Sequence, residues 1–347
     1  MKISTNLFTV LLSFSILTTA FADPGKAYVT NQEGGVSVID LETLKSTGNI
    51  NIEGKGPRGI GITQDGQFLI TANKDDDNIS VVNLKDNTVR HINVGKNPEF
   101  VRINGNFAFV STEPSSTGGP PPKQGEQTKD DDEDSKTPAR IAVVDLIKGV
   151  KIREIIGGPE TEGIEFSNDG KFVIISNEAD NTITVHDYLT GNLVKTIYTH
   201  SYGDRPRGIK ASPDGNFYIA TLEFSNKFIV IDKNFNILRA VPTGQAPYGV
   251  SFDKLGSRIY IASAKEKSLQ VYDAKTFDKI KDVPTGNRCW HFSFTPDEKY
   301  ILLACGKSNA VIVVDTEKLE KTSEISDKEV PWGIVTFPKS MGSLDKP

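Results

Sequence analysis

The sequence predicts an all-β fold, a seven-bladed β-propeller of four-stranded antiparallel blades, and a repeated unit carries this prediction. The unit recurs about every 42 residues, and within it apolar runs alternate with tight turns such as Gln64-Asp65-Gly66. Gly and Asp supply the backbone conformations that a tight hairpin needs, so these turns join strands. A period of this length with four strands per unit is typical of propellers.

The third strand of the unit shows the repetition most plainly. It is a five-residue run, rich in β-branched residues, that ends in Asp or Asn. Seven copies are present, at residues 36–40, 79–83, 141–145, 183–187, 228–232, 269–273 and 311–315. The chain begins with a second and a third strand and ends with a first strand, "PWGIVTFP". We therefore expect the C-terminal strand to complete the N-terminal blade, which closes the ring without an exposed sheet edge.

The first 22 residues predict a cleaved secretory signal. They contain one lysine, then an apolar segment, and they end in Ala20-Phe21-Ala22, which fits a cleavage site. The apolar segment is shorter than the roughly 20 residues of a membrane span. We expect a periplasmic protein with the propeller at residues 23–338 and a C-terminal tail at 339–347. The ordinary composition and the net charge of -5 argue against nucleic-acid binding.

One segment near the N-terminus, "AYVTNQEGGVSVIDLETLK", resembles the repeat of the YVTN-family β-propellers, and related segments recur from Gly25 to about Pro338. Seven repeats behind a secretory signal, with "VPWGIVTFP" near the end, are similar to the PQQ-dependent catabolism-associated β-propellers. This resemblance implies a protein that works beside quinoprotein alcohol dehydrogenases. We therefore expect a noncatalytic binding or accessory protein, monomeric and without a cofactor. Its partner would be the dehydrogenase, its cytochrome or a small anionic ligand.

The innermost strands of a propeller start at one mouth of the central channel. In this sequence the Pro and Gly that flank these starts are similar between units, whereas the residue between them changes character. The set comprises Arg58, Glu99, Glu162, Arg207, Tyr248, Trp290 and Trp332, with His291 replacing the usual Gly. It predicts a ligand- or partner-binding surface, in which arginines grip an anion and aromatic rings offer flat contacts. A structural alternative stays open, in which Arg pairs with Glu across the mouth and the aromatic side chains plug the channel.

Other functions stay open as alternatives. A metal-assisted hydrolase or lactonase would use Glu99, Glu162 and His291 as ligands or base, although the sequence has no HExxH or GxSxG spacing to support it. A cell-surface adhesion or scaffold module is compatible with the fold and with export. The remaining histidines show no ligand spacing, so we expect no metal site.

The two cysteines, Cys289 and Cys305, flank one hairpin. If the hairpin turns at Asp297, they face each other, because each lies eight residues from that position. In an exported protein this arrangement predicts a cross-strand disulfide, with two buried thiols as the alternative.

An insertion at residues 113–138 interrupts the repeat. Successive innermost strands are 41 to 45 residues apart, except between Glu99 and Glu162, where the spacing is 63. The additional residues fall between the second and third strands of one blade, so we expect a loop beside the channel mouth. The loop holds seven acidic residues and three lysines, including the acidic run Asp130–Asp134. This run lacks the spacing of a calcium-binding loop, and we expect it to attract a basic partner.

Overall fold

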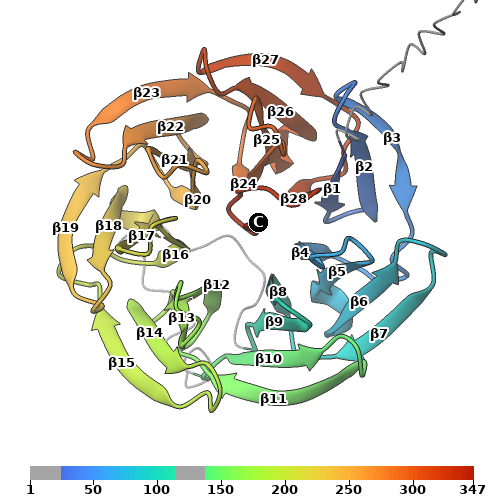
Figure 1. Cartoon of the computed structure of the whole chain (residues 1–347), viewed down its shortest axis with the longest axis horizontal. Coiled ribbons are helices and arrows are strands. Elements are labelled where there is room, and N and C mark those ends of the chain that lie inside the picture. The colour runs from blue at the N-terminus through green and yellow to red at the C-terminus, as the bar shows by residue number, and fades with distance from the viewer. Residues whose placement is uncertain (1–24, 115–136) are drawn as a thin grey trace, which may run out of the picture.

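The structure, a computed structural model, describes residues 25–114 and 137–347. These residues form seven four-stranded sheets, arranged as blades around a central axis (Figure 1). The predicted seven-bladed propeller is therefore confirmed. The predicted signal at residues 1–22 and most of the insertion lie outside the described residues. Within the described ranges, no helix has the length and apolar character needed to cross a membrane.

The first blade combines the two ends of the chain. Its strands, from the centre outward, are β28 (Pro331–Phe337), β1 (Lys26–Asn31), β2 (Val36–Asp40) and β3 (Lys45–Ile50). β28 pairs antiparallel with β1, with Val335 opposite Tyr28. The ring closes as the sequence predicts, so the inner edge of β1 is covered by backbone hydrogen bonds.

The other six blades each come from one continuous segment, again from the centre outward. The second has β4 (Pro57–Ile62), β5 (Phe68–Asn73), β6 (Asn78–Asn83) and β7 (Val89–Asn93), and the third has β8 (Pro98–Asn104), β9 (Phe107–Thr112), β10 (Arg140–Asp145) and β11 (Val150–Ile156). The fourth has β12 (Thr161–Phe166), β13 (Phe172–Asn177), β14 (Thr182–Asp187) and β15 (Leu193–Tyr198), and the fifth has β16 (Pro206–Ala211), β17 (Phe217–Leu222), β18 (Lys227–Asp232) and β19 (Ile237–Pro242). The sixth has β20 (Pro247–Phe252), β21 (Arg258–Ser263), β22 (Ser268–Asp273) and β23 (Lys279–Pro284), and the seventh has β24 (Cys289–Phe294), β25 (Tyr300–Cys305), β26 (Ala310–Asp315) and β27 (Glu320–Ile325). Short 3-10 helices follow three second strands, η1 (Lys74–Asp76), η3 (Glu223–Ser225) and η4 (Gly306–Ser308).

The core lies between neighbouring blades. The second and third strands of each blade are almost wholly buried and rich in Ile, Val and Ala, whereas most residues of the outermost strands are exposed or partly exposed. Aromatic residues fill the junctions; for example, the rings of Phe109 and Phe166 meet edge to face at 4.9 Å across the third and fourth blades. The packing faces of the strands thus hold adjacent blades together.

The predicted disulfide is confirmed. Cys289 in β24 lies directly opposite Cys305 in β25, and the two sulfur atoms are bonded. The bond joins the two inner strands of the seventh blade at the end where β24 begins.

The C-terminal tail, residues 339–347, turns back from β28 into the centre of the ring, where the chain ends (Figure 1). Its apolar side chains Met341 and Leu344 are buried. Gly342 forms an antiparallel bridge with Ser293 in the innermost strand of the seventh blade. The tail therefore occupies the channel along the inner strands.

Charged side chains from three consecutive innermost strands surround the tail. Arg102 Nη2 donates to Glu165 Oε2 at 2.7 Å, and Lys210 Nζ donates to the carbonyl oxygens of Gly342 and Asp345, each at 2.5 Å. Burial raises the pKa of Glu165, but Arg102 and its cationic neighbours outweigh this effect and lower the pKa to about 2. The tail and this buried charge network together fill the channel between the innermost strands of the third, fourth and fifth blades.

Candidate functional site

The side chains at the channel mouth owe their positions to a repeated backbone irregularity. In each blade the pairing of the innermost strand with the next strand shifts register near its start, as between Pro57 and Ile60 of the second blade. In that blade Arg58 and Gly59 lie opposite the single residue Ala72. A β-bulge of this kind releases a residue from the ladder and redirects its side chain. The variable ring of residues therefore sits on bulges, where a side chain is released from the regular alternation of the strand.

Hydroxyl groups and glycines hold the bulges of adjacent blades together. Thr30 Oγ1 donates to the carbonyl of Arg58 at 2.6 Å, and Thr221 Oγ1 donates to that of Tyr248 at 2.7 Å. Five of the seven ring residues are followed by glycine, and this close approach requires it at Gly208, where a Cβ would lie 2.5 Å from the Tyr248 carbonyl oxygen. The backbone under the mouth is consequently tied together between neighbouring blades.

Arg58 and Glu99 form one ion pair, between Arg58 Nη1 and Glu99 Oε1. The Arg58 Nε also donates to Gln32 Oε1 at 2.9 Å, and its side chain keeps 21% exposure. Glu99 is fully buried, and its second oxygen, Oε2, has no hydrogen-bond partner within the described part of the chain. A partly exposed guanidinium thus stands beside a buried carboxylate oxygen that is free to accept a hydrogen bond.

Arg207 is the centre of a larger network. It pairs with Glu162 and Glu178, and its Nε lies 2.7 Å from Glu223 Oε2. The Tyr248 ring lies against its guanidinium, 4.8 Å from the ring centroid, and the Tyr248 hydroxyl donates to Glu162 Oε1 at 2.7 Å. Because Arg207 keeps only 9% exposure of its side chain, it fixes these carboxylates rather than reaching toward solvent. The predicted structural alternative, pairing of Arg with Glu, is therefore present between neighbouring blades.

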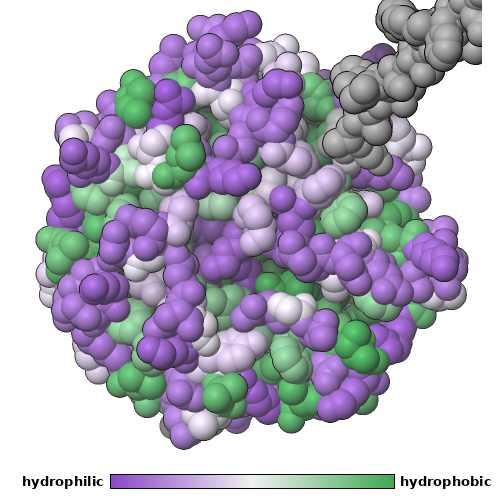
Figure 2. All heavy atoms as spheres, viewed as in Figure 1, coloured by the Kyte–Doolittle hydropathy of each residue, from purple (hydrophilic) through white to green (hydrophobic). Residues whose placement is uncertain are grey.

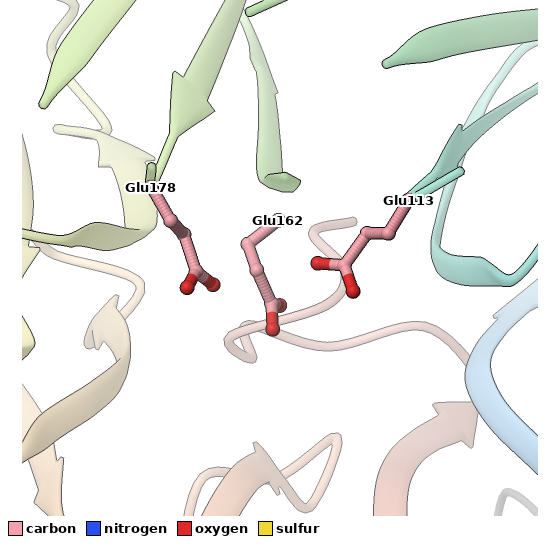
Figure 3. A group of neighbouring side chains, drawn as sticks. All are labelled: Glu113, Glu162 and Glu178. Carbon is pink, nitrogen blue, oxygen red and sulfur yellow. The ribbon is translucent and has the colours of Figure 1, made fainter. Parts of the chain in front are cut away.

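Three glutamates of this region converge on one space (Figure 3). Glu113, Glu162 and Glu178 are buried, and each offers an oxygen within 4.8 Å of the others. Burial and the charges of Glu99 and Glu162 raise the pKa of Glu113 well above its usual value. Burial also raises the pKa of Glu178 well above normal, although Arg205 and Arg207 oppose it. The mouth is thus rich in carboxyl groups that resist ionisation.

His291 belongs to an aromatic layer at the mouth. Its ring lies 4.3 Å from Trp332, 5.4 Å from Tyr248 and 6.0 Å from Phe100, measured between centroids. Phe100 comes from the third blade, so the layer spans the channel. Burial, together with the positive charge of Arg207, lowers the pKa of His291 to about 3, and the imidazole is therefore neutral at physiological pH.

The C-terminal tail sets the orientation of this histidine. His291 Nδ1 lies 3.0 Å from Ser343 Oγ, and the Ser343 hydroxyl donates to the carbonyl of Phe292 at 3.2 Å. With the hydroxyl proton donated to that carbonyl, Nδ1 would carry the imidazole proton and Nε2 would keep a lone pair. Nε2 is buried and has no hydrogen-bond partner among residues 25–114 and 137–347.

The structure gathers most of the predicted ring, but not all of it. Trp332 is 2% exposed and packs in the core beneath the mouth. Trp290 is half-buried, and its indole lies against Gly306 of its own blade. Of the insertion, Glu113 contributes its side chain to the mouth, while residues 115–136 lie outside the described residues. A view down the ring axis shows hydrophilic side chains gathered around a central hollow (Figure 2).

Two sets of charged residues escaped the sequence analysis. Glu113, Glu178 and Glu223 each follow the second strand of three consecutive blades. Comparing this one position across the seven repeats would have found them. A second set, Arg102, Glu165 and Lys210, occupies the fifth position of the innermost strand in the same blades, where the other repeats have small or apolar residues.

The raised pKa of Glu113 predicts a pH-dependent stability. The folded protein keeps a proton on Glu113, whose pKa is raised, whereas the unfolded chain releases it near the ordinary pKa of 4.5, so stability should fall as pH rises above that value. In Glu113→Gln this contribution is absent, and the dependence should weaken by at most about 1.4 kcal/mol per pH unit. Urea unfolding between pH 5 and 8, in the presence of a chelator, measures it. The exposed Glu42→Gln serves as the control, and equal pH slopes in the two variants would contradict the prediction.

Comparisons with known proteins agree with this architecture. The profile of the family described as "Lactonase, 7-bladed beta-propeller" matches residues 36–116 and 154–237, slightly less than half of the chain. No curated protein sequence matches the chain. The family match favours the lactonase alternative over the noncatalytic accessory role, and it lends no support to the YVTN or PQQ-associated resemblance.

Solved structures extend the likeness to most of the chain. A functionally unknown protein from Desulfotomaculum acetoxidans DSM 771 has a TM-score of 0.74 and 16% identity, over 90% of this chain and 98% of that one. The periplasmic gluconolactonase of Pseudomonas aeruginosa has a TM-score of 0.69 and 14% identity, over 90% and 98%. The hydrazine synthase of Kuenenia stuttgartiensis has a TM-score of 0.67 and 20% identity, over 88% and 99%. At these identities the likeness concerns the fold alone, so the chain is a seven-bladed β-propeller that matches the lactonase family over part of its length.

Proposed function

We propose that the protein hydrolyses a polar lactone at the channel mouth. The observation that carries the proposal is a pair of buried polar atoms, Glu99 Oε2 and His291 Nε2, that lack hydrogen-bond partners within the described residues. Leaving such atoms unpaired is costly, and in native proteins they are usually explained by a ligand or by water. The partial match to a lactonase family supports the choice of substrate class.

Each side chain would have a distinct role in this reaction. Water attacks the lactone carbonyl, the ring C–O bond breaks, and a hydroxy acid is released. Glu99 Oε2 would accept the proton of the attacking water, as a general base does, and would return it to the ring oxygen as the C–O bond breaks. Arg58, the partly exposed cation beside it, would stabilise the negative charge that develops on the carbonyl oxygen. His291 Nε2, a neutral acceptor, would orient the water or a hydroxyl group of the substrate.

Substitution of the base should abolish hydrolysis. We expect Glu99→Gln to lower kcat/KM by roughly 10²–10⁴-fold, and His291→Ala to lower it less, because an orienting group is lost rather than the base. D-glucono-1,5-lactone and a series of γ- and δ-lactones are suitable substrates, with the spontaneous hydrolysis rate subtracted. His186→Ala is the matched control, because His186 is also buried, has an unpartnered Nε2 in the described structure and lies in the outer half of the fourth blade. Wild-type rates equal to the spontaneous rate for every lactone would refute the proposal.

Export to the periplasm and a quinoprotein dehydrogenase or cytochrome partner remain proposals from the sequence. One structural relative is described by name as periplasmic, which supports the location. Capture of the exported protein from periplasm, with and without an alcohol substrate in the growth medium, tests the association. Recovery of neither a dehydrogenase nor a cytochrome under both conditions would reject it.

A further inference from the structure

We propose that Glu113, Glu162 and Glu178 bind one hard divalent cation of the Ca²⁺ class at the channel mouth. We expected no metal site from the sequence, and cation binding goes beyond lactone hydrolysis because it is measured without any substrate. It arises from the way the third and fourth blades bring together carboxylates that are far apart in sequence (Figure 3).

The spacing of the carboxylate oxygens suits calcium. One oxygen from each glutamate lies within 4.8 Å of the other two. Ca²⁺ binds oxygen at about 2.3–2.6 Å, so ligands on opposite sides of the ion are about 4.6–5.2 Å apart. Mg²⁺ gives up its water ligands reluctantly and is usually held by one or two carboxylates, so a set of three carboxylates favours the larger ion. An oxygen-only ligand set also disfavours the softer transition metals.

The charge balance of the mouth leaves room for a cation. Its ion-pair network contains three guanidinium groups, those of Arg58, Arg205 and Arg207. The carboxylates that pair with them in the described structure are Glu99, Glu160, Glu162, Glu178 and Glu223, and Glu113 is a sixth carboxylate that makes no ion pair there. Six carboxylates against three guanidinium groups leave three negative charges in a largely buried region. Such an excess is costly unless protons or a cation offset it.

A second, independent observation points to the same space. Glu99 Oε2 is fully buried and has no hydrogen-bond partner among the described residues. The charge of the Glu99 carboxylate is close enough to raise the pKa of Glu113 and of Glu162, two of the three glutamates. An unpartnered acceptor at this position would bind a water molecule of a hydrated cation, since Ca²⁺ takes six to eight oxygen ligands.

The protein already holds two of the three ligands in place. Arg205 and Arg207 fix Glu178, and the Tyr248 hydroxyl fixes Glu162. Glu113 comes from the neighbouring blade and directly follows β9, where its backbone N–H donates to the Asn97 carbonyl at 3.0 Å. Binding therefore requires little ordering of side chains, which favours affinity.

Calcium titration of the full chain tests the site. Isothermal titration calorimetry of chelator-treated wild-type protein should show one Ca²⁺ per chain, and Glu113→Gln should weaken binding by at least tenfold. Because Glu113 makes no ion pair among the described residues, its substitution leaves every arginine partner in place, and circular dichroism would confirm the fold. Glu162→Gln provides a second variant. Tb³⁺ luminescence excited through tyrosine should fall in both variants, since the Tyr248 hydroxyl lies 2.7 Å from Glu162 Oε1.

The acidic run of the insertion supplies the matched control. A variant with Asn at the four aspartates of Asp130–Asp134 and Gln at Glu133 should retain one Ca²⁺ with wild-type affinity. Loss of calcium binding in that variant, equal affinity of wild type and Glu113→Gln, or absence of stoichiometric binding to wild type would each overturn the proposal. None of these outcomes depends on lactone hydrolysis, so failure of the cation site and failure of the proposed activity remain distinguishable.

Discussion

Replacing Arg207 with alanine should lower the free energy of unfolding by about 3–5 kcal/mol, because the substitution leaves buried charges without a partner. Arg207 contacts Glu162, Glu178 and Glu223 and packs against the Tyr248 ring. Water cannot replace these contacts cheaply, since all three carboxylates are almost fully buried. Arg207→Lys should fall between alanine and wild type, because an ammonium keeps the charge but cannot bind three carboxylates in the same plane.

Urea unfolding followed by circular dichroism measures this loss. The control is Arg239→Ala, at an exposed arginine whose guanidinium lies 5.4 Å from the Phe277 ring centroid, and it should cost at most about 1 kcal/mol. Adding Glu162→Gln and Glu178→Gln to Arg207→Ala should restore part of the stability, because two of the unpaired charges disappear. Equal stability of the Arg207 and Arg239 variants would show that the network contributes nothing.

Removing the C-terminal tail, residues 339–347, should destabilise the propeller by about 3–6 kcal/mol, since burial of an apolar side chain contributes roughly 1.5–3 kcal/mol. The deletion removes the buried side chains of Met341 and Leu344 from the core. It also removes the two carbonyl groups that accept hydrogen bonds from Lys210. The shortened protein would then hold the buried ammonium of Lys210 without these acceptors. Burial, together with the positive charge of Arg102, already lowers the pKa of Lys210.

The role of Lys210 gives this prediction a sharper test. In the full chain, Lys210→Met should destabilise, because the tail carbonyls lose their donor. In the shortened chain the same substitution should stabilise, because an unpaired buried cation is replaced by an apolar side chain. Thermal and urea unfolding of the four proteins measures the reversal of sign. A Lys210→Met effect of the same sign and size in both backgrounds would mean that the tail and Lys210 are not coupled.

Repetition made the fold predictable. Seven copies of one strand pattern determined the number of blades, and the incomplete units at the two ends predicted that β28 joins β1. The disulfide followed from the same regularity, because Cys289 and Cys305 are symmetric about one hairpin turn. The number of blades, the ring closure and the disulfide all follow from spacings along the chain. Predicting them does not require knowing how the blades pack.

The site was less predictable, because its contacts join different repeats. The ring position of Arg207 was recognised, but its partners Glu178 and Glu223 occupy another position of the unit, after the second strand. The two positions of the unit come into contact only when the strands are packed in the folded propeller. The tail was unpredictable for a different reason, since residues 339–347 carry no strand pattern and their place depends on the buried charge of Lys210.

The closure of the ring also sets the order in which the molecule can be completed. Blades two to seven can form as the chain emerges from the ribosome, since each comes from one continuous segment. The first blade can be completed only at the end, because β28 is synthesised about 300 residues after β1. The channel is filled later still, by the tail that follows β28. A chain cut short before residue 331 would present the bare edge of β1 and an unfilled core. Proteases that degrade incompletely folded chains would therefore discriminate between chains with and without residues 331–347, which provide both ring closure and channel filling.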